Sequence, residues 1–137
     1  MFEDRYSFGT RLPALPVADV RNAAEVALKA EGFGILTEID VAATLKAKIG
    51  VERQPYLILG ACNPTMANRA ITADPAVGTL LPCNIVVRTD GDTVVVEAMD
   101  PRAALGMGGS AELGAIAEEV RAKLMRAVLA LETQLNG

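Results

Sequence analysis

The stretch Leu57-Ile58-Leu59-Gly60-Ala61-Cys62-Asn63-Pro64 decides the fold, because it holds an apolar strand, a thiol and a helix start in immediate succession. Apolar residues at consecutive positions from Tyr56 to Ala61 are typical of a central strand covered on both faces. Asn63 followed by Pro64 favours a helix start, since Asn is a good N-cap and Pro fits the first helical position. We therefore expect a strand over 56–61 and a helix over 65–73.

The rest of the chain carries alternating strand and helix patterns. They predict strands over 3–9, 33–39, 83–89 and 93–99 and helices over 17–31, 41–48 and 111–135, with Asp40 and Ser110 as the caps of the last two helices. Asp90-Gly91 between the last two strands is a strong hairpin signal. The predicted order is β-α-β-α-β-α-β-β-α. Strict alternation would suggest parallel units, but the hairpin and the terminal helix favour an α+β fold, with one mixed or antiparallel sheet and helices mainly on one face.

The composition bounds the class of protein. A chain of 137 residues predicts a single domain over 1–137. The chain has no histidine, which removes histidine triads, general bases and metal ligands. A net charge of −4 with 4% aromatic residues argues against a nucleic-acid partner. No apolar run approaches the ~20 residues of a membrane span, and the N-terminal residues lack signal-peptide features. We therefore expect a cytoplasmic protein without a membrane partner.

Hydrophobic residues make up 51% of the chain, which is high for a small domain with limited interior. The runs 57–61 and 85–87 are apolar on both strand faces. If helices cover one face of the sheet, the other face needs a partner. We therefore expect a homodimer.

An ordered set of short motifs carries a family resemblance. The motifs are Gly32-Phe33 leading to Ile39-Asp40-Val41, then Cys62-Asn63-Pro64, Asp74-Pro75, Leu81-Pro82-Cys83 and Asp100-Pro101. In this order and spacing the chain resembles the domain-of-unknown-function 302 family over roughly residues 15–132. The resemblance implies a compact α+β domain of TATA-box-binding-protein-like topology, often a homodimer, and no established activity. A fold name of that kind does not carry DNA binding with it.

The two cysteines each lie where a predicted strand meets a loop. Cys62 directly follows the run 56–61, and Cys83 begins the run 83–89 within Leu81-Pro82-Cys83-Asn84. If these strands are antiparallel neighbours, the two thiols meet. The helix start after Cys62 would lower a thiol pKa, so a redox pair or a soft-metal site for Cu(I) is one interpretation. The other interpretation is that both cysteines are small, buried hydrophobic residues.

Three polar residues complete the candidate ligand-binding set with Cys62 and Cys83. Asn63 and Asn84 each follow a cysteine and can donate and accept hydrogen bonds, and Arg69 could converge with Arg88 and Arg102 on an anion. The alternative is that Asn63 caps its helix, that Asn84 satisfies backbone groups and that the arginines are solvated.

Asp100-Pro101 is expected to open a loop that ends in the glycine-rich segment Gly106–Gly109. This segment resembles a phosphate cradle superficially. It lacks the Lys-Ser/Thr ending of a P-loop and the full spacing of a dinucleotide fingerprint. A flexible loop before the last helix is the preferred interpretation.

No complete catalytic motif is present. We therefore expect a non-catalytic homodimeric domain that binds a small ligand or a partner without a cofactor. Two alternatives stay open. One is a thiol-dependent redox or soft-metal function at Cys62 and Cys83, which are also the metal candidates of the chain. The other is a purely structural interaction protein.

Overall fold

The computed structural model describes residues 1–105 and 110–136. Our predictions for the segment Gly106–Gly109 fall outside this described part. The elements, in chain order, are β1 (Phe2–Glu3), β2 (Ser7–Leu12), α1 (Val17–Ala30), β3 (Gly34–Asp40), α2 (Val41–Ile49), β4 (Tyr56–Cys62), α3 (Pro64–Ala73), the 3₁₀ helix η1 (Pro75–Leu80), β5 (Cys83–Asp90), β6 (Thr93–Met99), α4 (Pro101–Leu105) and α5 (Ala111–Asn136).

The strands form one six-stranded sheet in the order β1-β2-β6-β5-β4-β3. Every neighbouring pair is antiparallel, so the predicted α+β class is confirmed and the parallel alternative is wrong. The strand expected over 3–9 is two strands, because the chain reverses at Asp4–Tyr6 and β2 continues to Leu12. β4 is not central but lies second from the β3 edge.

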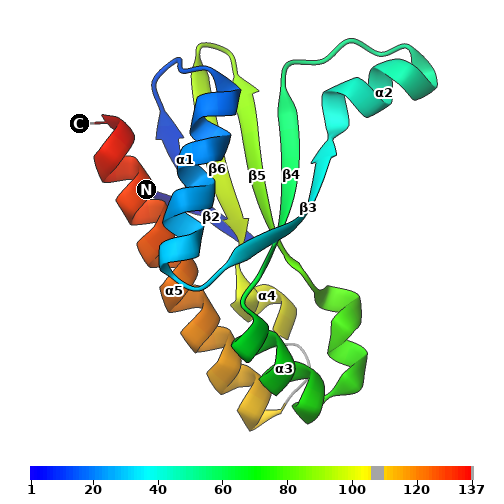
Figure 1. Cartoon of the computed structure of the whole chain (residues 1–137), viewed down its shortest axis with the longest axis vertical. Helices are drawn as coiled ribbons and strands as arrows, with labels where there is room; N and C mark the ends of the chain where they lie inside the picture. The colour runs from blue at the N-terminus through cyan, green and yellow to red at the C-terminus, as the bar shows by residue number, and fades with distance from the viewer. Residues whose placement is uncertain (106–109, 137) are drawn as a thin grey trace.

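The two long helices α1 and α5 lie on the same face of the sheet (Figure 1). The helices α3 and α4 and the 3₁₀ helix η1 gather at one end of it, while α2 projects from the opposite end. Residues at the predicted helical spacing fill the core, and those of α1 are Val20, Ala24 and Leu28. From α5 the buried residues are Leu113, Ile116, Ala117, Val120, Leu124, Ala127, Val128 and Leu131. The prediction of helices mainly on one face is confirmed.

Side-chain caps set the predicted helix starts. Oδ1 of Asp40 accepts from the Ala43 N–H at 2.9 Å, and Oδ1 of Asn63 accepts from the Met66 N–H at 3.2 Å. Oγ of Ser110 accepts from the Leu113 N–H at 3.3 Å. These bonds satisfy donors that have no partner inside the helix.

The structure adds a short helix where we predicted a loop after Asp100-Pro101. Proline tolerates the first turn of a helix, and Oδ1 of Asp100 accepts from the Arg102 N–H at 3.0 Å. Leu105 at the end of this α4 helix is 3% exposed. Burial of Leu105 therefore couples α4 to the core at the end of the sheet where α3 lies.

Within the described residues, no helix combines the length and apolarity needed to cross a bilayer.

Candidate functional site

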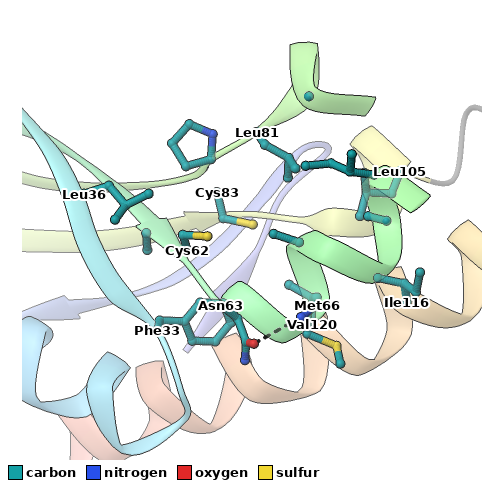
Figure 2. A pocket seen from close by; sticks show the side chains of 16 residues that line it. Phe33, Leu36, Cys62, Asn63, Met66, Leu81, Cys83, Leu105, Ile116 and Val120 are labelled. Atoms are coloured by element: carbon teal, nitrogen blue, oxygen red, sulfur yellow. Dashed lines mark hydrogen bonds between the residues drawn. The ribbon is translucent and has the colours of Figure 1, made fainter. Parts of the chain in front are cut away.

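The antiparallel pairing of β4 with β5 brings the two cysteines to the same end of the sheet. Ala61 lies opposite Cys83 in the register, so Cys62 is one residue beyond that pair. Figure 2 shows both thiols directed toward the same hollow. The condition stated from the sequence, that the strands be antiparallel neighbours, is therefore met.

A hollow of about 300 Å³ lies at this end of the sheet, between β4, β5, α3, η1 and the C-terminal helices. Most of its wall is aliphatic, aromatic or sulfur-containing. Its lining residues are Phe33, Leu36, Ala61, Cys62, Asn63, Met66, Ala67, Ala70, Ile71, Gly78, Leu81, Pro82, Cys83, Leu105, Ile116 and Val120. The hollow thus joins side chains from segments more than half the chain apart.

Burial controls the chemistry of Cys83. Its side chain lies in the core cluster, and removal of water from the thiolate raises the pKa of Cys83 to about 11, with repulsion from Cys62 adding to the effect. The Cys83 thiol is therefore protonated at neutral pH. The redox interpretation of the two cysteines needs a lowered thiol pKa, whereas the pKa of Cys83 is raised.

Asn63 has a structural task at the edge of the hollow. Its side-chain oxygen caps α3, as Figure 2 shows. Its Nδ2 lies so near Gly32 that an added Cβ there would come within 2.9 Å of it. Gly32 has φ +89°, a conformation that glycine adopts at the end of a helix without strain. The end of α1 is thus packed against the start of α3.

A β-bulge adds Leu36 to the wall. The register passes from Ile35 opposite Ala61 to Thr37 opposite Gly60, so Leu36 has no partner on β4. Bulges redirect side chains in this way. Leu36 is 68% exposed and still lines the hollow, which places it at the mouth.

Two predicted site residues lie elsewhere. Asn84 is exposed and sits opposite Gly60, on the sheet face away from Cys83, because strand side chains alternate. Arg69 pairs with Glu119 at 2.5 Å on the outside of α3. Arg88 and Arg102 pair separately with Glu97 and Glu118, so the arginines do not converge on one anion.

Sequence reasoning missed several wall residues. Phe33, Leu105, Ile116 and Val120 are ordinary core residues by pattern, and they meet only through tertiary packing. The bulge at Leu36 had no glycine or proline signal within Leu36-Thr37 to reveal it.

A larger hollow of about 510 Å³ lies between α1, α2 and the start of β4. Its charged residues are largely engaged with one another, as in Arg21 with Glu38 at 2.8 Å and Lys46 with Glu52 at 3.1 Å. This hollow is therefore a mutually neutralised polar surface, and the apolar hollow beside the cysteines is the stronger candidate site.

These features define an α+β domain with a single antiparallel sheet and an apolar pocket at the end of that sheet. Residues 8–131 match the model of the family described as "Domain of unknown function DUF302". The chain belongs to this family, as the resemblance had implied.

The fold is also similar to a solved structure. The uncharacterized conserved protein DUF302 from Bacillus stearothermophilus has a crystal structure that matches with a TM-score of 0.85 and 27% sequence identity, over 91% of this chain and 97% of that one. Among curated proteins none matches the chain.

Proposed function

We propose that this DUF302 chain is a non-catalytic homodimeric domain that binds a small molecule in the hollow beside Cys62, Asn63 and Cys83. The observation that carries the proposal is the hollow itself, which has a volume of about 300 Å³ and a mainly apolar wall with a few polar groups at one edge. Ligand sites have this character. The absence of histidine from the chain and the protonated state of Cys83 at neutral pH favour binding over catalysis.

A ligand screen by thermal shift tests the proposal. The proteins are the wild type and the Cys62→Ser, Asn63→Ala and Cys83→Ser variants. Asn84→Ala serves as the matched control, because Asn84 lies on the other face of the same strand. We expect hits that stabilise the wild type and the control and that lose much of their effect in the pocket variants. Hits that stabilise all five folded proteins equally would place the site elsewhere, and an absence of hits would favour a purely structural interaction protein.

A second candidate function is soft-metal binding. It is favoured by the two neighbouring thiols in one apolar wall, because thiolates select Cu(I). The raised pKa of Cys83 disfavours a free thiolate, but a bound metal displaces the proton.

An anaerobic Cu(I) titration against a competing chelator tests this alternative. Stoichiometric binding that is lost in both Cys62→Ser and Cys83→Ser would support it. Equal retention of copper by wild type and variants would refute it.

The homodimer proposal rests on the sheet face opposite α1 and α5. Ile39, Ile58 and Val86 are neighbours across three strands on this face, and Ile39 is 49% exposed. The projecting helix α2 adds Val41, Leu45 and Ile49, none of which is buried. A second copy would cover both apolar surfaces, and a stable interface of this kind buries roughly 2,000 Å² or more.

Sedimentation equilibrium tests the dimer. Ile39→Glu places a charge on this sheet face, and Val26→Glu places one at a 69% exposed site on α1. We expect the wild type and Val26→Glu to be dimers and Ile39→Glu to be a monomer. A monomeric wild type at micromolar concentration would contradict the proposal.

A cytoplasmic location completes the proposal. Both cysteines are free, and neighbouring thiols stay reduced in that compartment. Cell fractionation with thiol-state trapping would test it, and recovery of an oxidised protein outside the cytoplasm would oppose it.

A further inference from the structure

The hollow beside the cysteines offers no ionic partner to a ligand. Among the described residues, its lining contains no acidic or basic side chain. The one amide in the wall belongs to Asn63, whose oxygen already accepts from the Met66 N–H and whose nitrogen lies against Gly32. A charged ligand group would therefore leave water without compensation.

The Cys83 thiol does not change this balance. Burial raises the pKa of Cys83 to about 11, so at neutral pH it contributes a neutral, polarisable wall rather than an anion. Buried residues elsewhere in the wall include Ala61, Ile116 and Leu105, which are 0%, 0% and 3% exposed. The interior of the hollow is thus uncharged and mainly apolar.

The size of the hollow limits the occupant. Its volume of about 300 Å³ is about twice that of the ~150 Å³ apolar cavity that holds one benzene ring. The mouth is apolar as well, because the lining residues Leu36 and Ile71 are 68% and 44% exposed. A molecule entering there passes aliphatic side chains before it reaches Cys62 and Cys83.

We infer that the ligand is an uncharged, mainly apolar molecule about the size of two fused six-membered rings, which enters past Leu36 and rests against Cys62 and Cys83. This inference rests on the proposed small-molecule function and names its ligand class. Apolar contact supplies the affinity, and the absence of a charged partner excludes carboxylates and amines of the same shape.

Fluorescence titration with naphthalene tests the inference, because the chain contains no Trp and two Tyr, so background emission is low. The comparison probes are 1-naphthoate and 1-naphthylmethylammonium, which add one charge to the same rings, and toluene in competition. We expect naphthalene to bind at least about tenfold more tightly than toluene, which buries less apolar surface. Both charged probes should bind at least about tenfold more weakly than naphthalene.

Two variants locate the binding. Ala67→Leu extends into the hollow from α3, and Leu36→Ser removes an exposed apolar contact at the mouth. The matched control is Ala42→Leu on α2, far from the hollow. We expect Ala67→Leu to weaken naphthalene binding at least about tenfold and Leu36→Ser to weaken it about fourfold per methylene of lost contact. Circular dichroism checks that each variant is folded. If Ala67→Leu does not fold, Leu36→Ser still tests the location of the binding site.

The contrary outcomes separate the two proposals. If a charged probe binds the wild type as tightly as naphthalene does, and Ala67→Leu weakens its binding, the ligand class is wrong while small-molecule binding at this hollow stands. If naphthalene binds equally to the wild type, Ala67→Leu and Leu36→Ser, the assigned location is wrong. If no probe binds, the inference is overturned, and the broader screen described above decides the proposed function separately.

Discussion

The ionisation of Cys83 gives a stability prediction whose magnitude follows from the structure. The pKa of this thiol is raised from the ordinary value of 9.0 to about 11, first by burial and then by repulsion from Cys62. Between these pH values the unfolded chain has lost the proton and the folded chain retains it. The free energy of unfolding therefore falls as pH rises.

The expected loss is set by the size of the pKa difference. A rise of the Cys83 pKa from 9.0 to about 11 corresponds to about 3 kcal/mol of unfolding free energy, at ~1.36 kcal/mol per pKa unit. This contribution is fully present below pH 9 and is lost as pH rises through about 11. Because burial is the larger cause, most of the effect should remain when Cys62 is replaced.

Urea unfolding of two variants isolates the effect. Cys62→Ser leaves Cys83 as the only thiol of the chain, and the double variant Cys62→Ser/Cys83→Ala removes it. The other groups that titrate in this range are common to both proteins. We expect the stability advantage of Cys62→Ser over the double variant to shrink across this pH range by most of these ~3 kcal/mol. A difference that stays constant with pH would refute the buried, protonated state of Cys83.

Three further substitutions test the fold around the site, each measured by urea unfolding. Asn63→Ala should cost about 1 kcal/mol because the cap of α3 is lost, while Asn63→Asp should retain it; an equal loss in both would contradict the cap. Gly9→Ala should cost at least about 3 kcal/mol, since an added Cβ would lie 2.2 Å from the backbone oxygen of Val96. The control Gly114→Ala, with nothing within 4 Å, should stabilise α5 by up to about 1 kcal/mol; a similar effect of both glycine substitutions would oppose this packing. Leu105→Ala should cost about 2–5 kcal/mol, and a neutral result would mean that α4 does not belong to the core.

Local chemistry made much of the fold predictable. Asp40, Asn63 and Ser110 cap the helices that were expected to begin after them, because capping depends on residues within one turn. The Asp90-Gly91 signal is confirmed by the β5–β6 hairpin, in which Asp90 lies opposite Thr93. These features require no knowledge of distant parts of the chain.

The errors arose where long-range packing decides the structure. The run 56–61 suggested a central strand, yet β4 lies second from the edge. An apolar run in the sequence does not reveal which elements cover the strand or which strands pair beside it. Pro101 was interpreted as opening a loop, but burial of Leu105 stabilises the short helix α4 there.

The candidate site was predictable in part for the same reason. Cys62, Asn63 and Cys83 lie along one hollow because antiparallel pairing joins the end of β4 to the start of β5. Asn84 was included from its place beside Cys83, although strand alternation directs it to the opposite face. Ile116 and Val120 reach the hollow from α5, and no local signal distinguishes them from the rest of the helix stripe.

Methyl chemical-shift mapping of naphthalene binding by NMR tests the central claim most directly. The wall methyls of Leu81, Ile116 and Val120 report on the hollow, while those of Ile58 and Val95 report on the opposite sheet face. The account predicts saturable shifts of the wall methyls and unchanged signals from the opposite face. Shifts centred on Ile58 and Val95, or spread evenly over both sets, would contradict it.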